Sequence, residues 1–271
     1  MTRSINRRNH KEKASFKDKP PIREKFLIAA REETVQQQVV PKFTPATKNQ
    51  SIAVDYLKQG RNVVVLRGSA GAGKSMLAAW WAATKMKDKS IDKVFLIRPA
   101  VPTGNTIGLL KGSEEEKLAP FFVQTLVHLE TFMGAGFLHY CLEKKKIEMK
   151  AVEYLRGYSF ENCIVIAEES QNFTAPDMEM ALTRLGKNCQ IIFTGDEYQH
   201  DLRGTSGLQE TVELIQKTIE DEPEYLLDND LNELENGVGV VTFTPEDSMR
   251  GGLTKALVKM YYHMKSRNTN K

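Results

Sequence analysis

The sequence predicts an α/β fold in which helices cover both faces of a mainly parallel sheet. Short runs rich in Val and Ile alternate along the chain with longer segments whose apolar residues recur at helical spacing. The short runs are apolar at consecutive positions, which is typical of strands buried on both faces. A glycine-rich loop joins the first run directly to the first long segment. With 271 residues and no internal repeat, the chain is long enough for one such domain.

Five strands are expected, one from each apolar run. They are residues 62–67 (NVVVLR), 93–98 (KVFLIR), 163–169 (CIVIAEE), 189–196 (CQIIFTGD) and 238–243 (VGVVTF). β-branched residues dominate these runs, and glycine or polar residues follow most of them, so each has the length and composition of a buried strand.

Helices are expected between the strands and after the last one. Their approximate ranges are 75–86, 114–133, 175–185, 208–219 and a final helix from 251. Thr174 should cap the third helix, because Asp177 follows it by three residues. The first helix has Met76, Leu77, Trp80, Trp81 and Thr84 on one side, and we expect both Trp side chains in the core. The final helix carries an apolar face of Leu253, Ala256, Leu257, Met260, Tyr261 and Met264.

Charge divides the chain into an ordered domain and two unusual segments. We assign residues 1–43 to a basic arm, 44–265 to a single domain and 266–271 to a tail. Residues 1–25 hold nine Lys or Arg against three acids, which suits either a non-specific arm for phosphate backbones or a solubilising tail. Residues 220–237 contain eight carboxylates and no Lys or Arg, so we expect a surface excursion that faces away from any nucleic acid.

The composition argues against a membrane protein and against a metal site built from cysteine. No apolar run reaches the roughly 18 residues of a membrane span, and the polar N-terminus does not resemble a secretory signal. Cys141, Cys163 and Cys189 are far apart in the sequence, with no CxxC and no interleaved His. We therefore expect reduced core thiols in a cytoplasmic protein.

The glycine-rich loop has the sequence of a phosphate-binding loop. GSAGAGKS fits G-x-x-x-x-G-K-[ST] between a strand and a helix, and its residues are Gly68, Ser69, Ala70, Gly71, Ala72, Gly73, Lys74 and Ser75. The glycines let successive N–H groups point at phosphate oxygens, and the following helix directs its positive end at the same anion. Lys74 should reach the β- and γ-phosphates and Ser75 should hold Mg²⁺, so we expect ATP with Mg²⁺ as the ligand.

Carboxylates that follow the third strand should supply hydrolysis. Glu168 and Glu169 come directly after an apolar run, at the edge of the sheet that faces the ligand crevice. We assign Glu168 to the metal and Glu169 to the attacking water. Asp196 and Gln199 end the next strand in the same crevice, where the amide of Gln199 could bond both the γ-phosphate and the water.

Taken in order, these motifs resemble the PhoH-like family of P-loop ATPases. The segments are GSAGAGKS, IRPAV, IGLLKG, YLRG, IVIAEESQN, LTRLG, TGDEYQHDL and SGL, from about Thr47 to about Arg250. The family is similar to the motor core of superfamily-one helicases. The resemblance implies a RecA-like P-loop NTPase fold, ATP hydrolysis linked to RNA or single-stranded DNA, and assembly of copies into a homo-oligomer such as a hexamer. The small size resembles that of phage-encoded members, which would place the protein in the host cytoplasm.

The resemblance assigns roles to four more residues. Gln50 is similar to an adenine-reading glutamine, although a polar residue at a helix start would look the same. Arg98 and Arg156 stand where the family keeps basic residues, and either contact with phosphate or nucleic acid or a structural ion pair would account for them. Arg250 resembles a late arginine that could act as an arginine finger on the γ-phosphate, from the same or a neighbouring subunit.

Three departures from the family pattern leave alternative functions open. Glu168 stands where the family has Asp, Tyr158 stands where it usually has Arg, and residues 220–237 resemble an insertion. Because Mg²⁺ tolerates little geometric error, the longer Glu168 favours either slow turnover or a nucleotide-dependent binding or assembly switch with little hydrolysis. A small-molecule kinase shares the loop, but the paired acids and Gln199 fit water activation better. Strand unwinding would need a second RecA-like domain, for which this chain has no room.

Overall fold

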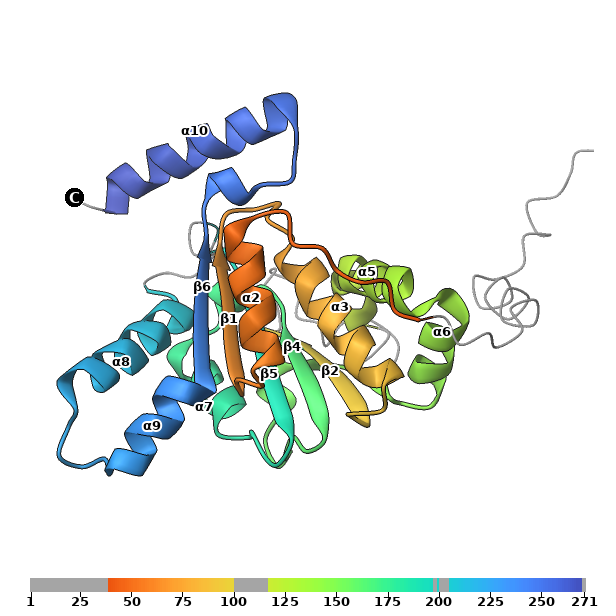
Figure 1. Ribbon diagram of the computed structural model, residues 1–271, viewed down its shortest axis with the longest axis horizontal. Coiled ribbons are helices and arrows are strands. Elements are labelled where there is room, and N and C mark those ends of the chain that lie inside the picture. The colour runs from red at the N-terminus through yellow and green to blue at the C-terminus, as the bar shows by residue number, and fades with distance from the viewer. Residues whose placement is uncertain (1–38, 100–116, 197–198, 200–204, 270–271) are drawn as a thin grey trace, which may run out of the picture.

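The computed structural model describes residues 39–99, 117–196, 199 and 205–269 (Figure 1). Most of the predicted basic arm and the predicted loop at 101–112 lie outside these residues. In the described chain a single sheet has the order β3-β2-β4-β5-β1-β6, and every neighbouring pair of strands is parallel. The strands are β1 (Val63–Gly68), β2 (Lys93–Arg98), β3 (Ile147–Ala151), β4 (Cys163–Ala167), β5 (Cys189–Gly195) and β6 (Val238–Phe243). The predicted α/β fold is confirmed.

β3 is the strand that the sequence did not predict. Its residues IEMKA alternate between apolar and charged, unlike the continuous apolar runs of the central strands. β3 lies at the edge of the sheet and pairs only with β2. There the Glu148 carboxylate lies 2.6 Å from Lys93 Nζ and 3.4 Å from Lys150 Nζ. These two ion pairs compensate the burial of the Glu148 charge.

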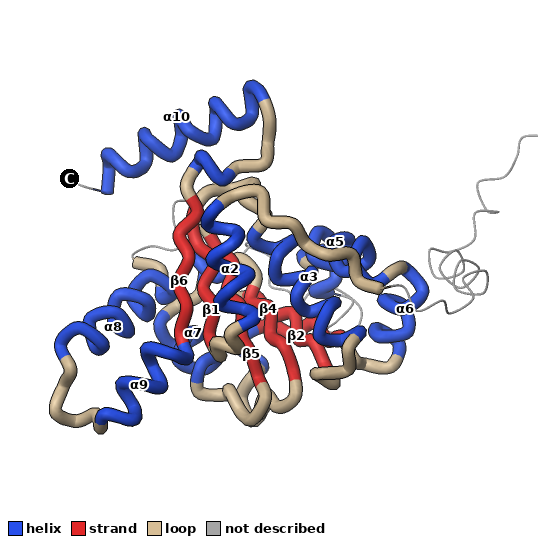
Figure 2. The backbone as a smooth tube through the Cα atoms, in the orientation of Figure 1, coloured by secondary structure: helices blue, strands red, loops and turns tan. Residues whose placement is uncertain are grey.

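Helices cover both faces of the sheet, as Figures 1 and 2 show. The first face carries α2 (Lys48–Lys58), α3 (Lys74–Lys87), α5 (Val123–Met133) and α6 (Ala135–Glu143). The second face carries α7 (Ala175–Leu182) and α8 (Gly207–Asp221). Two further helices flank β6, with α9 (Asp228–Gly237) before it and α10 (Gly252–Thr269) after it. Short 3-10 helices are η2 (Ala119–Phe121), η3 (Val152–Tyr154), η4 (Ser170–Asn172) and η6 (Pro245–Asp247).

Several helices differ from the sequence-based expectation. The helix expected at 114–133 is interrupted, because η2 contains Pro120 and α5 begins only at Val123. α2, α6 and α9 were not predicted, and α9 gives the expected acidic excursion a helical structure without buried residues. The cap of α7 is confirmed, since the Thr174 side chain accepts from Asp177 N and the Asp177 side chain accepts from Thr174 N.

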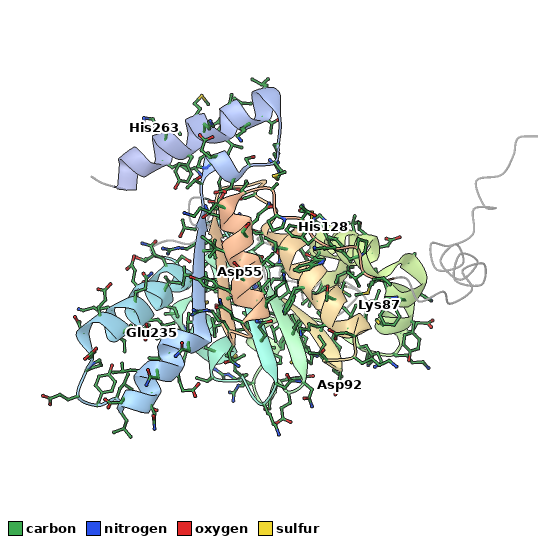
Figure 3. All side chains as sticks on the ribbon, viewed as in Figure 1. Asp55, Lys87, Asp92, His128, Glu235 and His263 are labelled. Carbon is green, nitrogen blue, oxygen red and sulfur yellow. The ribbon has the colours of Figure 1, made fainter. Side chains whose placement is uncertain are left out.

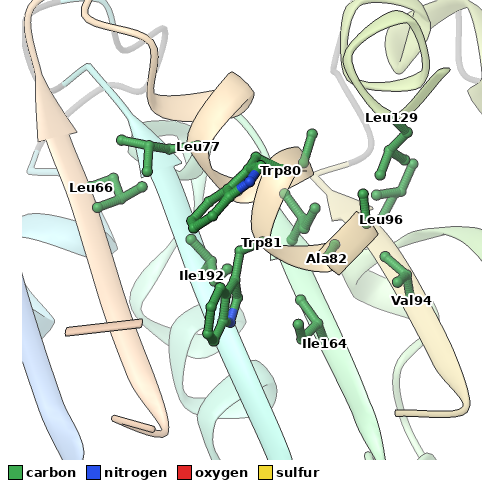
Figure 4. Packing of buried hydrophobic residues seen from close by; sticks show 14 of the residues in the cluster. Leu66, Leu77, Trp80, Trp81, Ala82, Val94, Leu96, Leu129, Ile164 and Ile192 are labelled. Carbon is green, nitrogen blue, oxygen red and sulfur yellow. The ribbon is translucent and has the colours of Figure 1, made fainter. Parts of the chain in front are cut away.

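α3 forms the centre of the core on the first face of the sheet. Figure 4 shows its apolar side chains packed over strands β1, β2, β4 and β5. Trp80 and Trp81 are both buried, which confirms their predicted place in the core. Trp81 Nε1 donates to Gln190 Oε1 on β5 at 2.5 Å, so the indole is satisfied inside the protein.

The three cysteines are free, buried thiols, as expected. The fold nevertheless brings two of them together. Cys163 on β4 and Cys189 on β5 are register partners, and their Sγ atoms lie 3.6 Å apart. The hydrogen bond between them and their burial raise the pKa of the Cys163 thiol. Among the described residues, no three His, Cys, Asp or Glu side chains gather as a metal site would require, and no helix is long and apolar enough to cross a membrane.

Candidate nucleotide-binding site

The phosphate-binding loop lies between β1 and α3, at the carboxyl edge of the sheet. Gly68 has φ +104°, and a Cβ at this position would lie 2.1 Å from the Phe243 carbonyl oxygen of β6. Gly73 has φ +82° and begins α3 from the left-handed region. Only glycine fits the first position, and glycine adopts the second without strain. The loop therefore requires its motif residues for reasons of backbone geometry.

Lys74 is held within the loop by main-chain carbonyl groups. Its Nζ donates to Gly68 O at 2.6 Å and to Ser69 O at 2.8 Å. Burial lowers the pKa of the Lys74 ammonium, and the negative charges of Asp196 and Glu168 act in the opposite direction. A cation that is largely removed from water interacts strongly with any phosphate that enters the loop.

Glu168 is buried below the loop and accepts three hydroxyl hydrogen bonds. Its Oε2 accepts from Ser75 Oγ at 3.0 Å and from Thr194 Oγ1 at 2.6 Å, and its Oε1 accepts from Thr125 Oγ1 at 2.8 Å. Burial raises the pKa of this carboxyl, Glu169 adds to the rise, and the three hydroxyls oppose it. Ser75 and Glu168 thus bring oxygen donors together where the loop meets the sheet, and this donor set fits Mg²⁺.

Glu169 lies beside Glu168 in an unusual backbone conformation. Its φ of +53° and ψ of +38° place a non-glycine residue in the left-handed region, and its side chain is exposed. Gln171 holds the carboxylate by donating from Nε2 to Glu169 Oε2 at 2.6 Å, and its Oε1 accepts from Asp196 N at 3.1 Å. Gln171 connects the ends of β4 and β5 across the crevice.

These groups line one cavity of about 440 Å³. Of the residues expected from the sequence, the cavity lining includes Ala70, Gly71, Ala72, Gly73, Lys74, Ser75, Glu168, Glu169, Gln199 and Arg250. Gly68 and Ser69 form the start of the loop but are not in the lining. Gln199 is oriented by a hydrogen bond from its Nε2 to Asp196 Oδ2 at 2.8 Å. The fold therefore assembles the loop, the paired acids, the amide and the arginine around one space.

Arg250 reaches the cavity of its own chain. The preceding residue fixes this segment, because Met249 N donates to Gly71 O at 2.9 Å. The stem of Arg250 packs against the loop, 3.0 Å from where a Cβ of Gly71 would lie. The absence of a side chain at Gly71 thus gives the arginine room at the phosphate-binding loop. The sequence left open whether this arginine acts on the cavity of its own chain or on that of a neighbouring subunit. In this structure it lines the cavity of its own chain.

Gln50 lies behind the loop, where its amide is already bonded to the chain. Its Nε2 donates to Ala72 O at 2.9 Å, its Oε1 accepts from Ala46 N at 2.8 Å, and the side chain is 1% exposed. In the described structure these contacts support the loop and do not face the cavity. Adenine reading by Gln50 stays a prediction, which would require this buried amide to become accessible to the base.

The two other arginines lie outside the cavity lining. Arg98, at the end of β2, is half-buried, and its Nη1 donates to Phe121 O at 3.2 Å while its Cζ lies 4.6 Å from the centroid of the Phe121 ring. Arg156 is exposed in the turn after η3. Tyr158 packs edge-on against Phe95 and lies under Lys150 Nζ, 4.6 Å from the ring centroid.

Sequence reasoning missed the contribution of α5. Gln124 and His128, one turn apart, line the cavity, and Thr125 holds Glu168 from the same helix. Figure 3 labels His128 on this helix. Burial lowers the pKa of His128, which favours its neutral form. The spacing of the two lining residues was visible in the sequence, but nothing in it indicated which face of α5 would turn toward the loop.

Comparison with known proteins agrees with this site. The family model described as PhoH-like protein matches residues 42–262. Protein PhoH of Escherichia coli (strain K12) is 35% identical over 224 residues, which cover 80% of this chain and 58% of that protein. The PhoH-like protein of Bacillus subtilis (strain 168) is 35% identical over 183 residues, which cover 64% of this chain and 57% of that protein. The PhoH-like protein of Synechocystis sp. is 33% identical over 219 residues, which cover 79% of this chain and 61% of that protein.

The chain thus spans somewhat more than half the length of these relatives. The match of the family model covers the loop, the paired acids and Arg250, together with the sheet that positions them. This chain belongs to the PhoH family of proteins with a P-loop fold.

Proposed function

We propose that this protein binds ATP with Mg²⁺ and hydrolyses it, and that hydrolysis is coupled to RNA or single-stranded DNA in a homo-oligomer. One observation carries the ATPase proposal: the cavity combines a phosphate-binding loop with two adjacent carboxylates in different environments. Glu168 is buried and bonded to Ser75, whereas Glu169 is exposed and, among the described residues, accepts a bond from Gln171 at one oxygen. One acid therefore suits a metal ion, and the other suits a water molecule.

The residues divide the reaction among them. Lys74 and the loop N–H groups bind the β- and γ-phosphates. Ser75 and Glu168 would hold Mg²⁺, which neutralises charge on the phosphates when bound. Glu169 takes a proton from the attacking water as that oxygen bonds to the γ-phosphorus, and the bond to the ADP oxygen breaks. Arg250 offsets the charge that develops on the transferred group, and Gln199 orients the water.

ATP turnover by the full chain tests this proposal. We expect Mg²⁺-dependent release of phosphate that is stimulated by RNA or single-stranded DNA more than by duplex DNA. Lys74→Ala should remove the activity, while Lys58→Ala, an exposed lysine on α2, should keep it. An inactive wild-type protein, assayed with and without each nucleic acid, would sink the proposal.

The coupling to nucleic acid rests on the basic first 25 residues and on the exposed Arg156. Phosphate contacts by such residues are independent of sequence and weaken as salt rises. Arg156→Ala should therefore lower RNA affinity about equally for different sequences and reduce its salt dependence. We also place the protein in the cytoplasm, because three free thiols persist best in a reducing compartment.

A second candidate function is a nucleotide-dependent switch with little hydrolysis. Glu168 favours it, because this carboxylate is longer than the Asp of the family pattern and three hydroxyls already bond its two oxygens. Glu168→Asp discriminates the two functions. A large gain in turnover would support the switch, and unchanged turnover would support a competent ATPase in which Glu168 already has the required geometry.

A further inference from the structure

The C-terminal helix α10 exposes an apolar face that its own chain does not cover. Five large side chains recur along one side with exposed fractions between 41% and 75%: Leu253, Leu257, Met260, Tyr261 and Met264. Positions 253 to 264 extend over about 17 Å of helix. Figure 1 shows α10 projecting from the body beyond the end of β6. A continuous apolar face of this length on a water-exposed helix indicates a partner.

The attachment of α10 to the body leaves this face free. Lys255 Nζ donates to Glu246 O at 2.9 Å, and Lys259 Nζ forms a 2.6 Å ion pair with the Glu246 carboxylate. Both contacts are to η6, the short helix that precedes α10. The body therefore anchors α10 near its beginning, and the five apolar side chains named above stay exposed in the described chain.

Charge identifies the surface that fits α10. Residues 252–265 contain three lysines and no acidic residue. The hairpin formed by α8 and α9, residues 207–237, contains ten acidic residues and a single lysine. Oppositely charged patches attract one another and select partners. Figure 3 labels His263 on α10 and Glu235 on α9, and the two regions lie at separate ends of the molecule.

The hairpin also exposes apolar side chains that α10 could cover. Leu214 on α8 and Tyr225 and Leu227 in the connection to α9 are each more than 60% exposed. The hairpin thus offers α10 both apolar contact and the opposite charge.

In the described chain, α10 and the α8–α9 hairpin are attached to opposite ends of β6. α9 leads directly into the first residue of β6, and α10 follows its last residue through η6. The six residues of β6 separate the two attachment points by about 20 Å along the strand. Because β6 is paired with β1 along its whole length, it cannot shorten to bring them together. A second copy of the chain supplies the complementary surface.

We propose that α10 of one copy docks on the α8–α9 hairpin of a second copy. This inference deepens the homo-oligomer part of the proposed function by naming the interface. Each copy offers α10 to one neighbour and the hairpin to another, so the contact is heterologous and propagates from copy to copy. Arg250 precedes α10 by two residues, so docking also fixes the segment that brings this arginine to the nucleotide cavity.

Molar mass in solution, measured for the full chain without nucleotide, gives the first test. We expect the wild-type protein to assemble at micromolar concentration and to dissociate as salt is raised, because the interface is charged. Leu257→Glu with Met260→Glu should weaken assembly at least tenfold. Tyr140→Glu, a matched change of an exposed residue on α6, should not. A wild-type protein that stays monomeric, or an assembly that tolerates the double change, overturns the proposal.

Mixing two defective proteins tests the pairing itself. The first carries the double change on α10, and the second carries Glu220→Lys, Glu224→Lys and Glu233→Lys on the hairpin. Each should be monomeric alone, whereas a mixture should form a dimer through the one intact α10 and the one intact hairpin. Circular dichroism and melting temperature establish that both proteins are folded. A mixture that stays monomeric overturns the proposal.

Two further readouts separate this inference from other outcomes. If the change on α10 lowers RNA affinity and leaves the molar mass unchanged, α10 contacts nucleic acid and the proposed interface is wrong. ATP turnover is measured in parallel on the wild-type protein. An assembled protein without turnover would overturn the ATPase proposal alone, and an active protein whose assembly ignores α10 would overturn the interface alone.

Discussion

α3 and α10 both begin at the nucleotide cavity, yet they continue into opposite surroundings. α3 follows the phosphate-binding loop and enters the core, where most of its side chains are buried. α10 follows Met249 and Arg250, which line the same cavity, and then leaves the body with its apolar face exposed. The first helix is held by its own chain. The second helix has an apolar face that its own chain leaves exposed. The residues that line the cavity therefore lead into the core on one side and to an exposed surface on the other.

This difference suggests a division of work between the two helices. α3 directs its positive N-terminal end at the phosphates and cannot move without disturbing the sheet below it. The segment before α10 is attached to the loop by one main-chain hydrogen bond, from Met249 N to Gly71 O. We therefore expect changes along α3 to affect folding, and changes along α10 to affect catalysis and assembly.

The largest effect is expected at Arg250, in the segment just before α10. Arg250→Ala should lower the turnover number about 10³-fold, equivalent to about 4 kcal/mol, because an arginine finger acts on charge that forms only in the transition state. Arg250→Lys should recover part of the loss, since it keeps the charge without the planar fork. Steady-state kinetics with a separate ATP-binding measurement check this. Equal losses in binding and turnover would contradict a role in the transition state.

A buried leucine on α3 should give the next largest effect. Leu77 is fully buried, so Leu77→Ala should lower the free energy of unfolding by about 3 kcal/mol through lost apolar contact and the cavity that remains. Chemical denaturation at a protein concentration low enough to keep the chain monomeric measures this change. A loss below about 1 kcal/mol would mean that α3 is less firmly packed than its burial indicates.

Local motifs and contacts between distant parts of the chain differed in how well the sequence predicted them. The loop and the two glutamates were found because their chemistry depends on a short motif or on residues next to an apolar run. β3 was missed because the charge of Glu148 is compensated by Lys93 on the neighbouring strand β2, a contact that only the topology creates. The same applies to Thr125, whose bond to Glu168 joins residues 43 positions apart.

The helical spacing of α10 was visible in the sequence, whereas the exposure of its apolar face was not. Periodicity shows which residues share a face, but it does not show whether the same chain covers that face. The pairing of Cys163 with Cys189 was hidden for a similar reason, because only the strand order makes β4 and β5 neighbours. Both features are set by long-range contacts, which the local sequence does not show.

At Glu168, below α3, we expect a smaller effect on the free energy of unfolding. It has the opposite sign to that of Leu77→Ala, because the substitution should stabilise the protein. Burial raises the pKa of this carboxyl in the folded protein, so its contribution to stability is present at low pH and is lost as pH rises through the folded value. Glu168→Gln should therefore stabilise the metal-free protein by on the order of 1 kcal/mol at pH 8, and by progressively less toward pH 4. Denaturation in a chelator across this range measures the difference. A variant that is less stable than the wild type at pH 8 would show that the hydroxyl network outweighs the burial of charge.

The smallest effect on folding is expected from Leu257→Ala on α10, the counterpart of Leu77→Ala. Leu257 is 41% exposed, and alanine favours the helix slightly, so the free energy of unfolding of the monomer should change by less than about 0.5 kcal/mol. At concentrations where the wild type assembles, the same change should lower the apparent stability, because binding of a second copy stabilises the folded state. Denaturation at a low and a high protein concentration separates the effect on the monomer from the effect on the assembled protein. A loss of 2 kcal/mol at the lower concentration would mean that α10 packs on its own chain, and the distinction between the two helices would fail.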